Sequence, residues 1–348
     1  MTPHNYCKSM LPKVSRTFAL NIAILKGDLY KATLCSYLLC RILDTVEDTT
    51  FKNLEAQEQL LDSFKEMFLK EDFSEKTIQA WVEAFFAAAR CRDEENEYYH
   101  LIRNTKLIVE NFLTLSSASR DAIAQCIAEM ASGMCKMVVR RERENSNLCF
   151  LKTIDDLHEY CYYVAGTVGI LSTRLFLEYS DYFSRFTLQH MNKPAVSLAL
   201  GLQITNIIKD CQRDYKRGVC YIPEEMLLSN GLDSENLFES NNREQIQNIV
   251  NALVERAANH LYKAMDSILS FPKRAFRIRL SCLWPLILAI NTLIEVKDNP
   301  NLLSGKNVKV SRSRVGKLIR RTTILCWSNR ALRKYFDGFR RHLVEDSA

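Results

Sequence analysis

The chain has few of the residues that break helices. Its 348 residues include only 10 glycines and 7 prolines, so long stretches run without a strong break signal. Within those stretches, apolar residues recur at a helical period. With 47% apolar residues, the chain is long enough to bury a large core. The sequence therefore predicts an all-α protein.

Paired cysteine motifs and long apolar runs are also missing. Twelve cysteines are present, but none forms a Cys-x-x-Cys pair, so buried reduced thiols in a cytoplasmic protein are expected rather than disulfides or zinc ligands. Residues 1–13 lack the apolar core of a signal peptide. The longest apolar run, 280–290, is interrupted by Ser281 and Pro285 and is too short to span a bilayer, so no membrane anchor is expected.

A strong net charge is missing as well. The 47 basic and 41 acidic residues leave +6 at pH 7, so we expect no nucleic-acid partner. Bases concentrate in 306–321 and 330–341, on segments that also carry Trp327 and Phe336. A solvated basic face is the interpretation we favour, and peripheral adsorption to an anionic membrane is the alternative.

Several long helices are expected from the apolar periodicity. Residues 27–48, 118–143, 192–214 and 242–271 should each form one helix. Residues 277–296 should form a core helix that is broken near Pro285.

The first of these segments ends in an acidic cluster. On a helix, Tyr37, Arg41, Asp44 and Asp48 are spaced by four, three and four residues, so they share one stripe. Glu47 leans toward the same cluster. Three carboxylates within about one turn repel one another, so a cation is expected between them.

The third segment repeats this arrangement. Gln203, Asn206, Asp210 and Asp214 recur at helical spacing, with isoleucines between them. Oxygen ligands that are too few to satisfy a cation alone suit Mg²⁺, which completes its octahedron with water and substrate phosphate. The hypothesis is a cavity between two acidic helices that holds a diphosphate through magnesium. Two amphipathic helices with solvated acidic faces are the alternative.

A tyrosine-rich segment supplies further candidates. On a helix, Tyr160, Tyr163 and Thr167 share one face, while Gly166 and Gly169 let another group approach the backbone. A tyrosine at such a position stabilises a carbocation or passes a proton, and ordinary buried tyrosines are the alternative.

Residues 15–18 precede an apolar stretch near the N-terminus. A hydroxyl there either caps a helix or, with Arg16, donates to a phosphate.

These motifs resemble those of the squalene/phytoene synthase family of head-to-head prenyl transferases. The resemblance spans most of the chain, and the motifs occur together in the family's order and at its separations. They are Ser15-Arg16-Thr17-Phe18, Tyr37-x3-Arg41-x2-Asp44-Thr45-Val46-Glu47-Asp48, Tyr160-Cys161-Tyr162-Tyr163-Val164-Ala165-Gly166, Gln203-x2-Asn206-Ile207-x2-Asp210-x3-Asp214, Arg217-Gly218-x2-Tyr221-x-Pro223 and Val308-Lys309-Val310-Ser311.

The resemblance implies an all-α isoprenoid-synthase fold, a single helical domain over residues 1–348 around a central cavity. Two aspartate-rich helices would face each other at the mouth of that cavity, and a basic helical segment would occupy about 312–345. We expect a monomer that binds two molecules of farnesyl diphosphate.

The resemblance also implies roles for individual residues. Magnesium would bind at Asp44, Glu47, Asp48, Asn206, Asp210 and Asp214, and would neutralise the diphosphate as the allylic bond ionises. Tyr160 would assist the proton loss that forms the cyclopropane, with Asp44, Asp48, Asp210 and Asp214 as the other catalytic residues. Substrate contacts are implied at Ser15, Arg16, Thr17, Phe18, Tyr37, Arg41, Gln203, Asn206 and Lys209. NADPH contacts are implied at Arg16, Arg41, Lys209, Lys309 and Arg312.

Four positions depart from the family pattern. Arg213 stands where many relatives have an acid, Lys209 replaces an arginine and loses its bidentate geometry, and Val219 occupies an often basic position. Ser311 stands where animal squalene synthases have a base, and Arg312 is the expected substitute. The carboxy-terminal membrane helix of those enzymes is absent, so a soluble or peripheral prokaryotic member is expected.

The expected reaction joins two farnesyl diphosphates into presqualene diphosphate and reduces it to squalene with NADPH. One alternative is formation of phytoene or dehydrosqualene, which needs no reductant. A non-catalytic helical partner subunit and a terpene cyclase that uses one diphosphate are the others. The run 308–312 favours the reductive enzyme, and the intact acidic sets favour catalysis.

Overall fold

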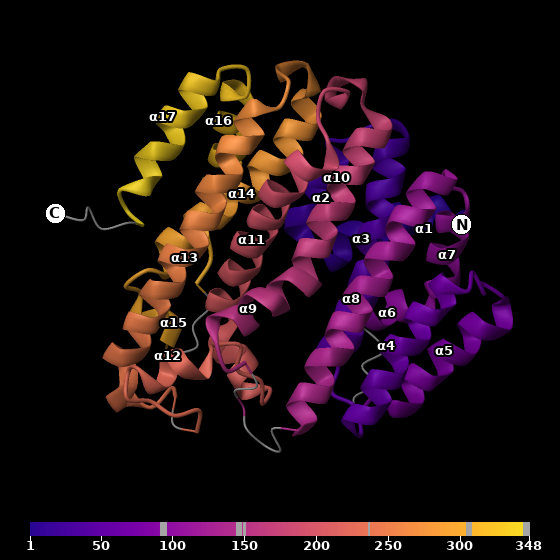
Figure 1. The fold of residues 1–348 in the computed structure, drawn as a ribbon, viewed down its shortest axis with the longest axis horizontal. Helices are drawn as coiled ribbons and strands as arrows, with labels where there is room; N and C mark the ends of the chain where they lie inside the picture. The colour runs from indigo at the N-terminus through magenta and orange to yellow at the C-terminus, as the bar shows by residue number, and fades with distance from the viewer. Residues whose placement is uncertain (91–95, 144–147, 149–150, 236, 304–307, 344–348) are drawn as a thin grey trace. The chain divides into compact units, whose positions relative to one another are not determined.

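The computed structural model describes residues 1–90, 96–143, 148, 151–235, 237–303 and 308–343 (Figure 1). These residues are mostly helical; the described part contains no strand, only an isolated bridge between Phe51 and Ala89. The all-α prediction is therefore confirmed. The chain forms two compact units: unit 1 comprises 1–143 and 167–188, and unit 2 comprises 144–166 and 189–348. The expectation of a single domain stays a prediction.

Unit 1 is organised around helix α3, which spans Gly27–Asp48 as predicted. This helix contacts α1, α2, α4, α6, α7, α8 and α10. The other elements are α1 (Pro3–Val14), α2 (Arg16–Ala23), α4 (Leu54–Leu69), α5 (Glu75–Ala88), α6 (Glu97–Arg103), α7 (Thr105–Leu113), α8 (Ser117–Arg143), α10 (Thr167–Tyr179) and the short η2 (Asp181–Phe183).

Helix α3 is held along its length and at its acidic end. Leu38, Ile42 and Leu43 are fully buried, and each such side chain contributes about 1.5–3 kcal/mol. At the C-terminal end, the buried Gln57 amide donates to the carbonyls of Val46 (2.9 Å) and Glu47 (2.8 Å). These bonds satisfy carbonyls that have no partner inside the helix.

Unit 2 has a second core, around α13 (Arg243–Ser270) and α14 (Phe276–Val296), which contact each other. Helix α16 contacts α14, and α17 contacts both α14 and α16. The other elements are α9 (Ile154–Cys161), η1 (Tyr162–Gly166), α11 (Leu188–Lys216), α12 (Glu224–Leu228), η3 (Ser240–Asn242), η4 (Lys273–Ala275), α15 (Pro300–Leu303), α16 (Arg312–Leu325) and α17 (Asn329–Arg340).

Helix α14 is continuous through Pro285, so the predicted break is wrong. Proline removes one hydrogen bond from the helix, and the packing of a mostly buried helix compensates for that loss. The guanidinium of Arg279 is fully buried in this helix. It donates to the carbonyls of Leu269 (3.2 Å) and Phe271 (2.5 Å) and to Oδ1 of Asn329 (2.7 Å).

Two helical stretches, Ser117–Glu142 and Lys273–Val296, are long and apolar enough to cross a membrane by length and composition alone. The sequence analysis considered only the apolar run 280–290 and therefore underestimated the apolar length of the second helix. Within the protein, 56% of the first apolar window and 72% of the second are buried. A buried Arg279 bonded to its neighbours is typical of a packed core helix, and the absence of an anchor stays a prediction.

The cysteines of the described residues are free thiols, and most of them are buried. Burial raises the pKa of the Cys211 and Cys282 thiols to about 12, which keeps them protonated at neutral pH. This matches the expectation of buried reduced thiols.

The tyrosine-rich segment is not one α-helix. Helix α9 ends at Cys161, a π-helix runs over Tyr162–Gly166, and α10 begins at Thr167. A π-helical turn contains more residues than an α-helical turn, so the regular α-helical spacing behind the predicted common face does not hold across this segment, and the common face of Tyr160, Tyr163 and Thr167 stays a prediction. Gly166 is needed for packing, because a Cβ there would lie 2.8 Å from Cδ2 of the Tyr162 ring.

Gly201 lets α11 approach α13 closely, and replacing it tests this packing. An added Cβ would lie 2.8 Å from Cγ and Cδ2 of Leu261 and 3.2 Å from the carbonyl oxygen of Ala257. We expect Gly201→Ala to lower the free energy of unfolding by about 1–3 kcal/mol in urea denaturation, because the core is overpacked.

Gly316→Ala in α16 is the matched control, since a Cβ there meets nothing within 4 Å. It should raise stability by up to about 1 kcal/mol through helix propensity. The same change in both variants would contradict the packing role of Gly201.

Candidate functional site

One partly exposed stripe runs along the C-terminal half of helix α3. Tyr37, Arg41 and Asp44 are half-buried, Asp48 is exposed and Glu47 lies beside it, whereas the other side chains from 38 to 46 are buried. The structure therefore places these residues on one face, as predicted.

The N-terminal motif contacts this stripe through Phe18. The rings of Phe18 and Tyr37 lie 5.7 Å apart between centroids. Nη2 of Arg41 donates to the Tyr37 hydroxyl at 3.0 Å, and Nη1 of Arg41 lies 3.2 Å from Oδ2 of Asp44. Four of the predicted site residues thus form one continuous chain of contacts within unit 1.

The electrostatics of the α3 stripe favour an added cation. Desolvation raises the pKa of Asp44 to about 6; Arg41 opposes this shift, and Asp48 adds to it. The carboxylates lie at the C-terminal end of α3, where the helix dipole is negative and no basic residue occupies the last turn. Three carboxylates beside one guanidinium leave a formal charge of −2 on these side chains.

Arg41 has a donor to spare. Desolvation opposes its charge, but Asp44 and Tyr37 outweigh this effect and raise its pKa, so the guanidinium stays charged. Its Nε is buried and has no hydrogen-bond partner among the described residues. An acceptor such as a phosphate oxygen would satisfy it.

On the α11 stripe, both carboxylates contact cations. Nζ of Lys209 lies 3.3 Å from Oδ2 of Asp210 and 3.4 Å from Oδ1 of Asn206. Arg213 lies 3.3 Å from Asp210 and 3.9 Å from Asp214.

Arg217, in the loop after α11, also reaches Asp214, at 3.3 Å. Its guanidinium therefore contacts a carboxylate on the preceding turn. Two carboxylates beside Lys209, Arg213 and Arg217 leave a formal charge of +1. The α11 stripe therefore has three cations beside its two carboxylates, whereas Arg41 is the one basic residue within the α3 motif itself.

Tyr160 stacks on the loop that follows α11. It is 3% exposed, and its ring lies 4.7 Å from that of Tyr221 at 25°. Val219, at the position that is often basic, is buried and donates its N–H to the carbonyl of Asp214. The packing therefore links Tyr160 to the acidic helix, and its catalytic role stays a prediction.

Three predicted binding positions are simple to place. The Ser15 hydroxyl caps α2 by accepting from the N–H of Phe18 at 3.2 Å, which confirms the capping interpretation. Thr17 is exposed, and Gln203 is half-buried on α11. Arg16 begins α2, but its side chain lies outside the described residues.

Two of the predicted NADPH residues of unit 2 lie at or just before the start of α16. Lys309 and Arg312 are exposed, and the Ser311 hydroxyl caps the helix by accepting from the N–H of Arg314 at 3.2 Å. Two exposed cations beside a helix N-terminus fit the phosphates of a nucleotide.

No group of three or more His, Cys, Asp or Glu side chains in the described residues is arranged to hold a metal by itself. Mg²⁺ needs no such group, because it binds one or two carboxylates and completes its shell with water and phosphate. The donor set of α3 fits this chemistry: it has oxygen ligands only, and Asp48 contributes to the raised pKa of Asp44.

Sequence reasoning missed two residues that shape the two stripes. Gln57 fixes the end of α3, and Gly201 sets the approach of α11 to α13. Neither belongs to a recognisable pattern, because their contacts are made with other segments of the chain.

Comparison with known proteins identifies relatives along nearly the whole chain. The family model of squalene/phytoene synthases matches residues 11–314. "Squalene synthase 1" of Arabidopsis thaliana is 30% identical over 326 residues, which are 92% of this chain and 72% of that protein. "Inactive squalene synthase 2" of the same plant is also 30% identical, over 92% of this chain and 71% of that protein.

Solved structures share the fold. The complex of TcSQS with the ligand BPH1237 has a TM-score of 0.80 and 23% identity, over 99% of this chain and 94% of the other. A dehydrosqualene synthase in complex with a ligand has a TM-score of 0.54 and 19% identity, over 97% of both chains. At these identities the structures establish the isoprenoid-synthase helical fold alone.

The raised pKa of Asp44 predicts a particular pH dependence in metal-free protein. A carboxyl with a pKa of about 6 in the folded state, against 3.8 ordinarily, binds its proton more tightly when folded. Stability from this group is therefore present below pH 3.8 and is lost as pH rises to about 6.

Urea denaturation in a chelator, at pH 4 and pH 7, measures this effect against Asp44→Asn. The wild type should lose about 1–3 kcal/mol more than the variant between the two pH values. An equal loss in both proteins would contradict the assignment.

Proposed function

Because the chain belongs to the squalene/phytoene synthase family, we propose that it joins two molecules of farnesyl diphosphate head to head. The product, presqualene diphosphate, is then reduced to squalene with NADPH. The α3 stripe is the main support, because a family motif is present there as a connected set of carboxylates and a guanidinium with an unpaired donor.

In this proposal, α3 binds diphosphate on one side of Arg41. The guanidinium is held by Tyr37 and Asp44, which leaves Nε to donate to a phosphate oxygen. Asp44, Glu47 and Asp48 would hold magnesium, with the negative end of the helix dipole behind them. When bound, magnesium neutralises the leaving diphosphate.

Helix α11 offers both oxygen ligands for magnesium and basic side chains for the diphosphate. Asn206, Asp210 and Asp214 offer oxygen ligands, while Lys209, Arg213 and Arg217 bring more positive than negative charge to the same stretch. A cation that binds a phosphate oxygen would no longer pair with its carboxylate, which would then be available to a metal. Arg213 thus supplies positive charge at a position where many relatives have an acid.

Tyr160 is proposed to assist the proton loss that forms the cyclopropane. Its hydroxyl is the only titratable part of the side chain, and its ring orientation is fixed by stacking on Tyr221. A fixed ring in an apolar surrounding excludes water, which would otherwise quench a carbocation.

The reductive step distinguishes the leading proposal from its closest alternative. The proposed NADPH contacts are Lys209, Lys309 and Arg312 in unit 2, and Arg16 and Arg41 in unit 1. A phytoene or dehydrosqualene synthase would need none of them for a reductant, and Lys309 and Arg312 have no other proposed role. A non-catalytic helical partner is a second alternative, since one relative of equal identity is named inactive.

Product analysis tests the proposal. Purified protein is incubated with Mg²⁺ and either farnesyl or geranylgeranyl diphosphate, with and without NADPH, and the hydrocarbons are identified by mass. We expect squalene from farnesyl diphosphate only when NADPH is present. A hydrocarbon that is unchanged when NADPH is omitted would overturn the squalene assignment, and a product from one diphosphate would indicate a cyclase.

Asp48→Asn and Asp210→Asn test the two stripes separately in the same assay. Each should lower turnover by at least about a hundredfold, because an oxygen ligand loses its charge. Asp121→Asn, at an exposed position on α8, is the matched control and should behave as wild type. Full activity in both stripe variants, with unchanged circular dichroism, would remove the metal–diphosphate proposal.

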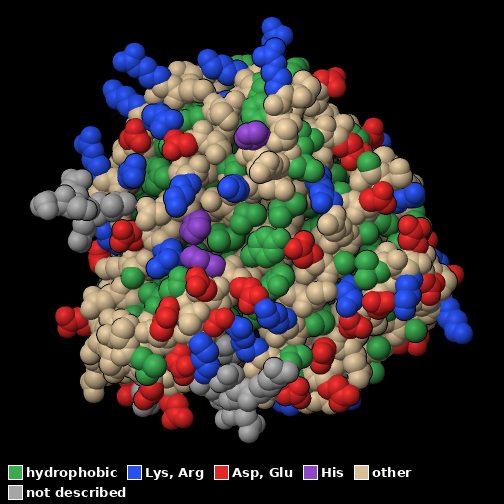
Figure 2. All heavy atoms as spheres, in the orientation of Figure 1, with side chains coloured by type: hydrophobic (Ala, Val, Ile, Leu, Met, Phe, Trp, Pro, Cys, Tyr) green, Lys and Arg blue, Asp and Glu red, His purple; other side chains and the backbone are tan. Residues whose placement is uncertain are grey.

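We also propose that the protein is a cytoplasmic monomer that contacts membranes peripherally through α16 and α17. Figure 2 shows Lys and Arg side chains gathered at the edge where these helices lie in Figure 1. Ile324, near the end of α16, is 68% exposed, and Trp327, between the two helices, is 53% exposed. The Trp327 ring lies 5.3 Å from that of Phe276 between centroids, at a tilt of 32°. Exposed tryptophan among bases suits an anionic membrane surface.

Sedimentation with phospholipid vesicles tests this contact. The wild type should bind vesicles that contain phosphatidylserine, and Trp327→Ser should bind about three- to tenfold more weakly because apolar area is lost. Leu228→Ser on α12, 65% exposed, is the matched control. Equal binding to purely zwitterionic vesicles, or no effect of Trp327→Ser, would contradict the proposal.

A further inference from the structure

A buried amide on α14 has no role in the proposed function as stated so far. Asn291 is 0% exposed, in a helix whose buried side chains are mostly apolar. Its Nδ2 donates to the carbonyl oxygen of Ile287, one turn earlier in the same helix, at 3.0 Å. This bond fixes the orientation of the amide, because a carbonyl oxygen can only accept. Oδ1 of Asn291 is therefore the atom that accepts a hydrogen bond from another element.

Arg314 on α16 donates to that oxygen. Its Nε lies 3.0 Å from Oδ1 of Asn291, and its Nη1 lies 3.5 Å from Oε1 of Glu295, one turn further along α14. One guanidinium thus contacts two side chains of the neighbouring helix with the fork geometry that lysine lacks. A buried oxygen is costly to leave unpaired, and hydrogen bonds from charged donors are among the strongest in proteins. The contact therefore fixes the start of α16 on α14.

This contact lies beside two residues that are proposed to bind the nucleotide. The backbone N–H of Arg314 donates to the Ser311 hydroxyl at 3.2 Å, so one residue carries both the helix cap and the link to α14. Val308, 7% exposed, is buried immediately before Lys309. Lys309 and Arg312 are exposed and lie between these two fixed points.

We propose that Arg314 is a positioning residue for the nicotinamide nucleotide and that it acts through Asn291. With the start of α16 held on α14, Lys309 and Arg312 meet the phosphates from a segment that is already ordered. Less conformational entropy is then lost when the nucleotide binds. This role rests on the proposed function, because it concerns the reductive step alone.

Direct contact of Arg314 with the phosphates is the alternative, and the two roles differ in what they predict for Asn291. This side chain is fully buried, so it does not reach a bound nucleotide. Replacing it leaves the charge of Arg314 in place and removes only the hydrogen bond that holds the guanidinium. A weaker affinity for the nucleotide in an Asn291 variant therefore reports a loss of position.

Steady-state kinetics with two readouts test this role. The protein is incubated with Mg²⁺ and farnesyl diphosphate; presqualene diphosphate is measured without NADPH, and squalene is measured over a range of NADPH concentrations. Asn291→Ala should raise the KM for NADPH about tenfold, while presqualene diphosphate forms within about twofold of the wild-type rate. A merely structural defect would lower both rates together.

Arg314→Lys is the second variant, and it keeps the test decisive if Asn291→Ala folds poorly. Lysine retains the positive charge but cannot reproduce the fork, so the KM for NADPH should rise to a similar degree. Direct contact with the phosphates would instead leave the KM close to the wild-type value, because the charge is kept.

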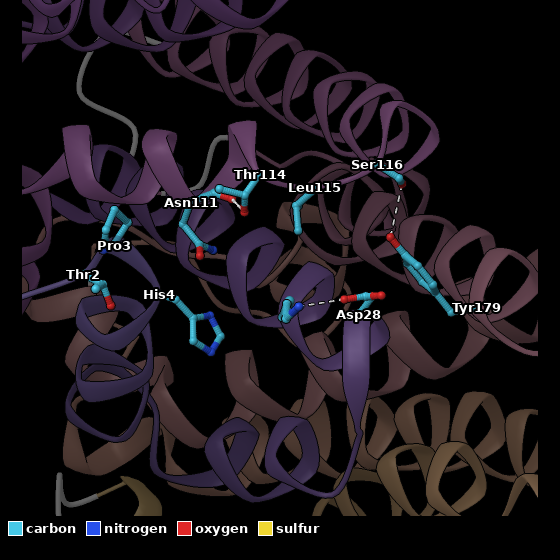
Figure 3. A pocket seen from close by; sticks show the side chains of 10 residues that line it. Thr2, Pro3, His4, Asp28, Asn111, Thr114, Leu115, Ser116 and Tyr179 are labelled. Carbon is cyan, nitrogen blue, oxygen red and sulfur yellow. Dashed lines mark hydrogen bonds and ion pairs between the residues drawn. The ribbon is translucent and has the colours of Figure 1, made fainter.

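Two further variants control for the loss of a basic side chain. Arg320→Gln removes an exposed arginine from the same helix, α16. Lys31→Gln removes a cation that pairs with Asp28 at 2.8 Å, on the wall of a cavity of about 510 Å³ in unit 1. Figure 3 marks this pair with a dashed line; both residues belong to α3, so their pairing links no second helix. Both controls should keep the wild-type KM for NADPH.

The outcomes separate this role from the proposed function. A wild-type KM for NADPH in Asn291→Ala or in Arg314→Lys, or an equal rise in Arg320→Gln, would overturn the role of Arg314 and leave the proposed function intact. A wild-type protein that forms no squalene with NADPH would overturn the proposed function, and the role of Arg314 with it.

Discussion

The clustering of three carboxylates at the C-terminal end of a buried helix is the constraint on which the candidate site depends. Asp44, Glu47 and Asp48 repel one another and meet the negative end of the α3 dipole. The fold holds them there because leucine and isoleucine side chains bury the rest of the helix and Gln57 satisfies its last carbonyls. Repulsion among these carboxylates destabilises the free protein, and a bound cation would relieve it.

On the second acidic helix, α11, basic side chains pair with the carboxylates. On α11, Lys209, Arg213 and Arg217 lie within ion-pair distance of Asp210 and Asp214, so these carboxylates are compensated before any ligand arrives. In the proposed function, the carboxylates of α3 would bind Mg²⁺, and the basic side chains of α11 would bind diphosphate.

Patterns that depend on neighbours in the chain could be predicted from the sequence. The bounds of α3 and the common face of Tyr37, Arg41 and Asp44 follow from the helical period alone. The π-helix at Tyr162–Gly166 and the unbroken α14 could not be predicted, because tertiary packing decides both against local preference. The roles of Gln57 and Gly201 were invisible for the same reason, since their partners lie elsewhere in the chain.

The hydrogen atom that serves as the side chain of Gly201 also bears on how homologues are compared. It lets α13 lie against α11 two residues before Gln203, so the spatial position of every proposed oxygen ligand on that helix is set partly by Leu261. Two homologues with the same carboxylates can therefore place them differently. An inventory of motif residues is insufficient to tell an active family member from an inactive one, and the helix-to-helix spacing beneath the motif belongs in the same comparison.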